Sequence, residues 1–245
     1  MSKEGNPLKV SITGIDGAGK STVVEDVVNS LGDLTVAKIV RPVYTHIDEQ
    51  REYHFSKLMK VVDFAHNMGD RMQSKKLSIT ANAIDVILQG RVIEPHFIRN
   101  LNPELMLGAR DYLIDPAVYA VYYSPRLADR SMKERIDFFQ KLTGVSVRDV
   151  IFFLTVPPEE AVARIERRIQ LEAEGTSSKR PKWRHMHENP RDLGILQEEY
   201  YSALDEIGRR SDPEIVEIDT SMYTQAEVAT TITAVIKGKL NGRFK

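Results

Sequence analysis

The sequence contains no cysteine and only one tryptophan among its 245 residues. The absence of cysteine excludes disulfides, thiolate metal sites and a cysteine nucleophile, and it fits an intracellular protein. No uninterrupted apolar run reaches the roughly 18 residues that a membrane span needs. The polar residues 1–7 lack the apolar run of a signal peptide. We therefore expect a soluble, cytoplasmic protein with no membrane partner.

The chain also lacks a strong excess of either charge. Its 34 Lys and Arg residues nearly balance 35 Asp and Glu residues, which gives a formal net charge of −1. This balance argues against a dominant nucleic-acid-binding surface. Hydrophobic residues make up 42% of the chain, enough for a substantial core. No repeat or low-complexity linker divides the sequence, so we expect a single domain over residues 1–245.

One glycine-rich motif carries a specific chemistry. Residues 14–22 fit the pattern Gly-x-x-x-x-Gly-Lys-Ser/Thr of a phosphate-binding loop, between a predicted strand at 8–13 and a predicted helix at 21–31. Glycines let successive backbone N–H groups turn toward phosphate oxygens. We expect Lys20 to reach the β and γ phosphates of ATP in catalysis, and the Ser21 hydroxyl to ligate Mg²⁺. The expected nucleotide-binding residues are Gly14, Asp16, Gly17, Ala18, Gly19, Lys20, Ser21 and Thr22. The alternative is a glycine-rich turn that only links strand to helix.

Strands alternate with helices along the rest of the chain. Further strands are predicted at 35–40, 104–109, 150–156 and 214–219, and helices at 159–172, 193–207 and 225–240. Residues 44–76 and 77–93 are predicted to be helical, within an acceptor-binding insert at roughly 44–104. This order predicts an α/β fold of the doubly wound P-loop NTPase type, with a parallel sheet of about five strands flanked by helices. Residues 173–192 are polar and basic, and we interpret them as a mobile lid.

The sequence resembles the thymidylate kinase family. The phosphate loop with Asp16, the segment 150–168 and the strand end at 216–220 carry the resemblance. It implies ATP- and Mg²⁺-dependent phosphoryl transfer to a nucleoside monophosphate, most simply dTMP, and it also implies a homodimer. The implied partner is a small nucleotide acceptor and not a nucleic acid.

The departures from that family fall at the acceptor site. The family's Asp-Arg-Tyr is replaced by Arg110-Asp111-Tyr112, and the spacing from Tyr112 to Tyr119 is kept. An Arg-Glu-Pro-Gly motif survives only as Arg41 followed by proline. Asp85 stands where the family offers an arginine to the acceptor phosphate. We expect the acceptor to be bound by Asp16, Arg41, Arg110, Asp111, Tyr112 and Tyr119.

Two acidic residues have alternative roles. Asp16 is expected to hydrogen-bond an acceptor hydroxyl or help to place Mg²⁺, and its alternative is to stabilise the loop's turn. Asp111 follows a predicted strand at the edge of the sheet where Mg²⁺-linked carboxylates lie, so it is a candidate metal ligand. Its alternatives are a helix N-cap or an ion pair with Arg110.

The predicted lid supplies basic side chains. Arg180 and Arg184 are the candidates for a catalytic arginine that stabilises the transferring phosphoryl group, since the phosphate loop itself has no arginine. His185 and His187 lie two residues apart, with Glu188 beside them. We do not expect a metal site here, because this set lacks a convincing third ligand.

Three functions therefore compete. The leading prediction is a nucleotide kinase that converts dTMP and ATP to dTDP and ADP. A second is a kinase acting on a deoxynucleoside or another small molecule with the same fold. A third is a non-catalytic nucleotide-binding protein.

Overall fold

The computed structural model describes residues 6–32, 34–39, 44–46, 64, 68, 84–174 and 187–243. Six strands form one sheet in the order β3-β2-β4-β1-β5-β6. They are β1 (Leu8–Thr13), β2 (Val36–Ile39), β3 (Tyr44–His46), β4 (Leu105–Gly108), β5 (Val150–Thr155) and β6 (Glu214–Asp219). All neighbours pair in parallel except β2 and β3. The five parallel strands and their flanking helices confirm the predicted fold class.

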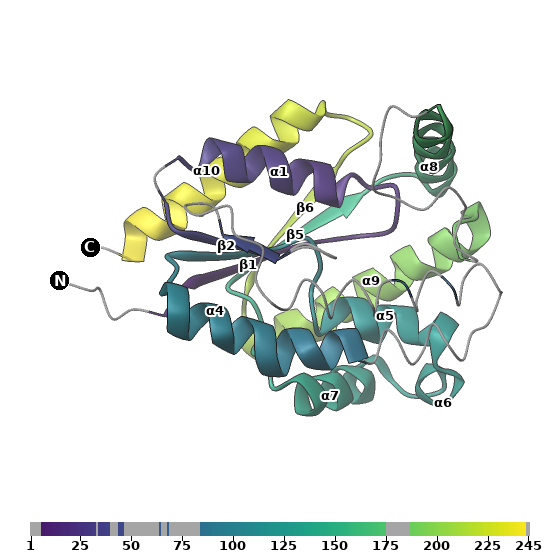
Figure 1. Cartoon of the computed structure of the whole chain (residues 1–245). Coiled ribbons are helices and arrows are strands. Elements are labelled where there is room, and N and C mark those ends of the chain that lie inside the picture. Colours follow the sequence, from purple (N-terminus) through teal and green to yellow (C-terminus); the bar gives the residue numbers. More distant parts are fainter. Residues whose placement is uncertain are drawn as a thin grey trace.

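Helices cover both faces of the sheet (Figure 1). One face carries α1 (Lys20–Ser30) and α10 (Gln225–Arg243), and the opposite face carries α4, α5, α7 and α9. The remaining bounds are η1 (Gln89–Ile93), α4 (Glu94–Leu101), α5 (Ile114–Tyr123), α6 (Pro125–Ala128), α7 (Met132–Thr143), α8 (Pro158–Ala173) and α9 (Pro190–Ser211). Every residue of β5 is buried, as expected for a central strand covered on both sides.

The sequence-based prediction was wrong at residues 44–46. This part of the predicted helix 44–76 is instead strand β3, antiparallel to β2 with Ala37 opposite His46. Tyr and Thr favour strands, and pairing with β2 overrides the weak helical pattern. Most of the predicted acceptor-binding insert at 44–104 lies outside the described residues.

A widened helical turn precedes α4. Residues 84–88 are helical and run into the π-helix η1, which leads directly into α4. Pro95 stands in the first turn of α4, and a proline ring clashes with the carbonyl four residues before it in a regular helix. The π-helical turn lies where that clash would fall. At the start of this turn, Gln89 donates a hydrogen bond to Asp85, four residues earlier.

The face of β1 toward α4 and α5 is polar. Lys9 forms an ion pair with Glu94 at 2.8 Å, and Ser11 donates to Asp111 at 2.9 Å. Thr13 donates to Asp115. These residues alternate with buried Leu8, Val10 and Ile12 on the other face, as the two-residue repeat of a strand requires. The β1 polar ladder (Lys9, Ser11 and Thr13) thus leads to the phosphate loop.

No helix in the described part of the chain is long and apolar enough to cross a membrane.

Candidate active site

The phosphate loop joins β1 to α1 and depends on close backbone packing. A Cβ added at Gly14 would lie 2.2 Å from the carbonyl oxygen of Leu154, and one at Gly17 would lie 2.5 Å from that of Ala161. Gly14, Gly17 and Gly19 also have positive φ angles of 141°, 88° and 88°. A side chain at Gly14 or Gly17 would therefore force the loop away from β5 or α8.

Gly19 differs from the other two glycines because a Cβ there would meet nothing within 4 Å. The loop thus has open space at Gly19, directly before the first turn of α1. Backbone N–H groups at a helix N-terminus and the positive end of its dipole favour a phosphate at such a place. The geometry fits a nucleotide phosphate cradle.

Lys20 lies across the phosphate loop. Its ammonium group donates to the carbonyls of Gly14 and Ile15, both at 2.8 Å, and the residue is 8% exposed. Burial lowers the pKa of Lys20, and Asp16 counteracts this effect. Because its closest contacts are with two carbonyls and its carboxylate partner Asp16 lies farther away, at 3.6 Å, the ammonium can turn toward incoming phosphate oxygens without breaking a close ion pair.

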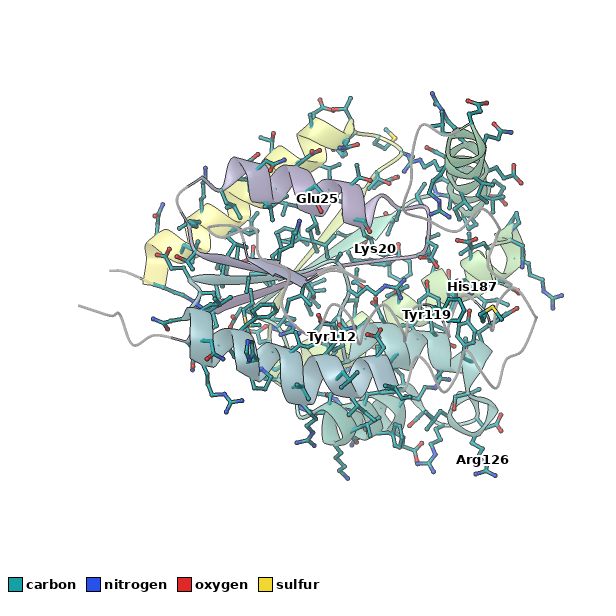
Figure 2. The ribbon with its side chains drawn as sticks, viewed as in Figure 1. Lys20, Glu25, Tyr112, Tyr119, Arg126 and His187 are labelled. Carbon is teal, nitrogen blue, oxygen red and sulfur yellow. The ribbon has the colours of Figure 1, made fainter. Side chains whose placement is uncertain are left out.

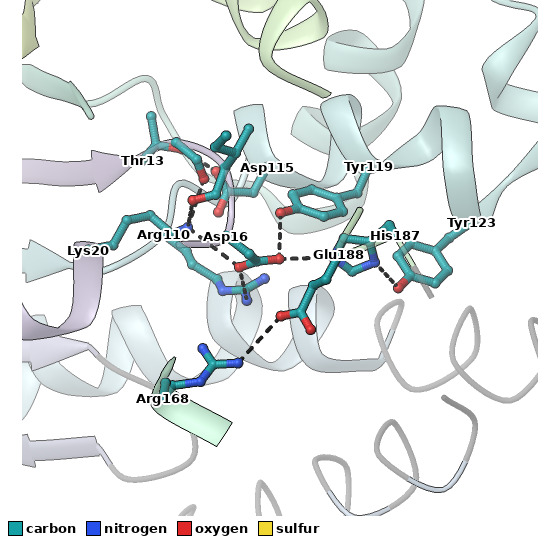
Figure 3. Close-up of polar contacts among 12 residues, drawn as sticks. Thr13, Asp16, Lys20, Arg110, Asp115, Tyr119, Tyr123, Arg168, His187 and Glu188 are labelled. Carbon is teal, nitrogen blue, oxygen red and sulfur yellow. Dashed lines mark hydrogen bonds and ion pairs between the residues drawn. The ribbon is translucent and has the colours of Figure 1, made fainter. Parts of the chain in front are cut away.

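Asp16 is the centre of the site (Figure 3). Its Oδ1 lies 3.6 Å from the Lys20 ammonium and 4.0 Å from the guanidinium of Arg110. Its Oδ2 accepts a hydrogen bond from the Tyr119 hydroxyl at 3.0 Å and lies 2.9 Å from Nε2 of His187. The structure therefore brings together five residues, from the phosphate loop, the start of α1, the segment after β4, α5 and the segment before α9.

The environment of Asp16 keeps its carboxylate ionised. Burial raises its pKa, but the charge of Lys20, the hydrogen bond from His187 and the charge of Arg110 together hold the pKa well below its ordinary value. A carboxylate with so low a pKa is a weak general base and a strong hydrogen-bond acceptor. Asp16 is thus suited to orienting a hydroxyl rather than removing its proton.

His187 enters the site from the segment that precedes α9. The residue is 3% exposed, and its Nδ1 lies 2.7 Å from the Tyr123 hydroxyl. The rings of Tyr119, Tyr122 and Tyr123 pack around it at centroid distances of 5.2, 5.6 and 5.6 Å. Figure 2 shows Lys20, Tyr119 and His187 toward the same end of the molecule.

The neighbouring Glu188 is also anchored. This residue is 1% exposed and lies 3.5 Å from the guanidinium of Arg168 on α8. The chain thus leaves α8 after Ala173 and returns at His187 beside the phosphate loop. Arg180 and Arg184 belong to the stretch between, which lies outside the described residues, as does Arg41.

Asp111 has contacts that fit the helix-capping alternative. Its Oδ1 accepts from the backbone N–H groups of Leu113 and Ile114 at 2.8 and 2.9 Å, and its Oδ2 accepts from Ser11. The residue is 3% exposed at the start of α5. Both carboxylate oxygens are therefore used within the protein, while the preceding Arg110 points toward Asp16.

Asp115, which the sequence analysis did not single out, lies one helical turn after Asp111. Its Oδ1 accepts from Thr13 and, at 3.1 Å, from the Tyr200 hydroxyl, whereas its Oδ2 has no hydrogen-bond partner among the described residues. Burial raises the pKa of Asp115 to about 6, against the opposing charges of Arg110 and Lys20. The alternation of polar residues along β1 was a sequence signal that a polar partner faces Thr13.

Tyr112 takes part in a different cluster. It is 4% exposed, and the Arg148 guanidinium lies 5.1 Å from the centre of its ring. Arg148 also forms a 3.0 Å ion pair with Glu94 and lies 3.9 Å from Asp111. Of the predicted tyrosines, the structure thus brings Tyr119 to Asp16 and places Tyr112 under Arg148.

Among the described residues, no group of three or more His, Asp, Glu or Cys side chains is arranged to hold a metal ion. Ser21 lies at the start of α1, next to Lys20 and the open space at Gly19. A hydroxyl at that position fits a cation that is carried chiefly by nucleotide phosphates.

Comparison with known proteins places the fold. No family model matches the chain, and no curated protein matches it either. Solved structures of deoxyadenosine kinase from M. mycoides do match. The structure with the products dCMP and a flexible dCDP has a TM-score of 0.55 and 19% identity, over 96% of this chain and 99% of that one. Those with dCTP and dATP have TM-scores of 0.53 and 0.52 at 18% and 20% identity, with the same coverage.

Because identities are near 20%, these matches show a shared fold and no more. The described part of the chain shares their fold, a parallel sheet with helices on both faces and a phosphate loop after β1.

Proposed function

We propose that this protein is an ATP-dependent kinase whose acceptor is a deoxynucleoside. The observation that carries the proposal is the Asp16 carboxylate, held ionised within a phosphate loop and facing Lys20 and Arg110. A simple nucleotide-binding turn does not need a partly buried carboxylate beside its phosphate site. A kinase does need a group that orients an acceptor hydroxyl toward the γ-phosphate.

The residues divide into a donor side and an acceptor side. Loop N–H groups and Lys20 would hold the phosphates of ATP, and Ser21 would hold the accompanying Mg²⁺, which would neutralise developing charge. Asp16 accepts a hydrogen bond from the attacking hydroxyl, while Tyr119 and His187 keep the carboxylate in place. Arg110 supplies a second positive charge, and its side chain is 38% exposed.

Two points support a deoxynucleoside rather than dTMP. Asp85, which stands where thymidylate kinases offer an arginine to the acceptor phosphate, is 4% exposed and bonded to Gln89. A buried carboxylate at that position would repel a monophosphate. In addition, three solved structures that share the fold are those of a deoxyadenosine kinase with deoxynucleotides bound.

The second candidate acceptor is a deoxynucleoside monophosphate, most simply dTMP. Arg110 favours it, because its partly exposed guanidinium beside Asp16 could bind the acceptor phosphate in place of the missing arginine. Arg41, Arg180 and Arg184 stay predictions for additional phosphate contacts. For Arg180 and Arg184, the contact of nearby His187 with Asp16 supports the prediction.

An acceptor panel tests the proposal. ADP release would be measured with ATP·Mg²⁺ and, in turn, the four deoxynucleosides, dTMP and the other monophosphates. We expect turnover with at least one deoxynucleoside and a rate at least about 10-fold lower with dTMP, the order that one unfavourable charged contact produces. Turnover with dTMP alone would select the second candidate. No turnover with any acceptor, together with intact ATP binding, would contradict both.

A further inference from the structure

We infer that His187 is a positioning residue that fixes the orientation of Asp16 for phosphoryl transfer. The inference rests on the proposed kinase function and assigns a role to a residue outside the phosphate loop. It starts from the 2.9 Å contact between Nε2 of His187 and Oδ2 of Asp16, which joins residues 171 positions apart in the sequence.

The chemistry of the pair fixes the direction of this hydrogen bond. An ionised carboxylate can only accept, so Nε2 of His187 must carry the proton and donate it. Nδ1 faces the Tyr123 hydroxyl at 2.7 Å, and that hydroxyl can either donate to a neutral ring or accept from a charged one. Tyr123 therefore holds the imidazole so that Nε2 points at Asp16 in both states of the ring.

Packing restricts the ring further. His187 is 3% exposed and is surrounded by the edges and faces of Tyr119, Tyr122 and Tyr123. The same Oδ2 atom also accepts from the Tyr119 hydroxyl. With Oδ2 bound twice, Oδ1 is turned toward Lys20 and Arg110, at 3.6 and 4.0 Å. Those longer distances leave Oδ1 as the oxygen suited to receive a hydrogen bond from an acceptor hydroxyl.

The position of His187 in the chain adds a second consequence. The residue directly follows the basic stretch with Arg180 and Arg184, and Glu188 next to it binds Arg168 on α8. The hydrogen bond from His187 therefore connects the segment just after this basic stretch to Asp16, the residue that orients the acceptor. Loss of the Nε2 donor should disturb catalysis more than ATP affinity, because Lys20 and the loop amides hold the phosphates independently.

The test compares two substitutions that differ in one hydrogen bond. His187→Gln keeps a side-chain N–H of similar reach, whereas His187→Leu keeps apolar volume and loses the donor. With the best acceptor of the panel, we expect kcat to fall about 10- to 100-fold in His187→Leu with the KM for ATP within about 3-fold of wild type. His187→Gln should recover kcat to within about 5-fold of wild type. His96→Leu on α4 is the matched control and should keep the wild-type kcat.

Equal losses of kcat in both His187 variants would overturn the inference, because they would indicate a packing role. An unchanged kcat in His187→Leu would overturn it as well. A wild-type enzyme that transfers phosphate to no acceptor marks failure of the proposed function instead.

A histidine ¹⁵N NMR spectrum then tests the hydrogen bond between His187 and Asp16 directly, without any phosphate acceptor present. We expect an Nε2–H signal that is absent in His187→Gln and shifts in Asp16→Asn. Lack of this signal in the wild type would overturn the inference.

Discussion

At the scale of single residues, the pKa values of two aspartates near the phosphate loop, partly buried Asp16 and buried Asp115, are shifted in opposite directions. Cations outweigh burial at Asp16 and hold its pKa well below the ordinary value. Burial outweighs the cations at Asp115 and raises its pKa to about 6. Asp16 is thus anionic at every physiological pH, whereas the pKa of Asp115, about 6, lies close to physiological pH. The two residues are of the same type, so the difference between their pKa values comes from their surroundings.

Asp115 should make stability fall as the pH rises. The folded state binds its proton more tightly than the unfolded chain, so stability is lost between about pH 4 and pH 6, by about 3 kcal/mol for two pKa units. Asp115→Asn removes this dependence. In urea denaturation, the free energy of unfolding of the variant relative to wild type should therefore rise by about 3 kcal/mol from pH 4 to pH 7. Exposed Asp129→Asn is the control, and a difference that is constant with pH would refute the prediction.

At the scale of secondary-structure elements, a buried ionic cluster joins β1, α4 and the segment before β5. Glu94 is bound by Lys9 and Arg148, and Arg148 also reaches Asp111 at the start of α5. Burial raises the pKa of Glu94, but the charges of Arg148 and Lys9 lower it below its ordinary value overall. The cluster thereby fixes α4 and the start of α5 against the strand that leads into the phosphate loop.

Arg148→Met should strongly destabilise the protein. Removing the cation leaves Glu94 and Asp111 buried without their shared partner, at a cost of about 3–5 kcal/mol. The double variant Glu94→Gln, Arg148→Met should lose less than the sum of the two single losses, since the buried Glu94 charge that had lost Arg148 is gone. Thermal and urea unfolding would measure both. Arg126→Met, at an exposed site on α6 (Figure 2), should change stability by no more than about 0.5 kcal/mol.

The prediction would be contradicted if the stability losses of the two single variants added up in the double variant. It would also be contradicted if Arg148→Met destabilised the protein no more than Arg126→Met.

At the scale of the whole molecule, local patterns were enough for the fold. The bounds of β1 and β6 match the sequence-based ranges, because short runs of apolar and β-branched residues favour strands. Strand β3 was missed, since a three-residue edge strand has little periodicity of its own. The phosphate loop could be found because its chemistry lies in consecutive residues.

The surroundings of the loop could not be predicted in this way. His187 meets Asp16 only through tertiary packing, and no spacing in the sequence marks that pair. Asp111 stays a candidate metal ligand, and only its contacts with Ser11 and the first amides of α5 favour the helix-capping alternative. The roles predicted for Arg41, Arg180 and Arg184 remain predictions. Long-range contacts of this kind depend on how the elements are packed, which composition and periodicity do not encode.

The most direct test of the central claim is transfer of labelled γ-phosphate from ATP to the best acceptor by the wild-type protein and by Lys20→Ala. Wild type should form labelled product, and Lys20→Ala should lose at least about 100-fold in rate, the order expected for removing one electrostatic contact to the transition state. ATP affinity measured on the same samples separates binding from transfer. Wild-type transfer that persists unchanged in Lys20→Ala would contradict the assignment of the phosphate loop as the catalytic site.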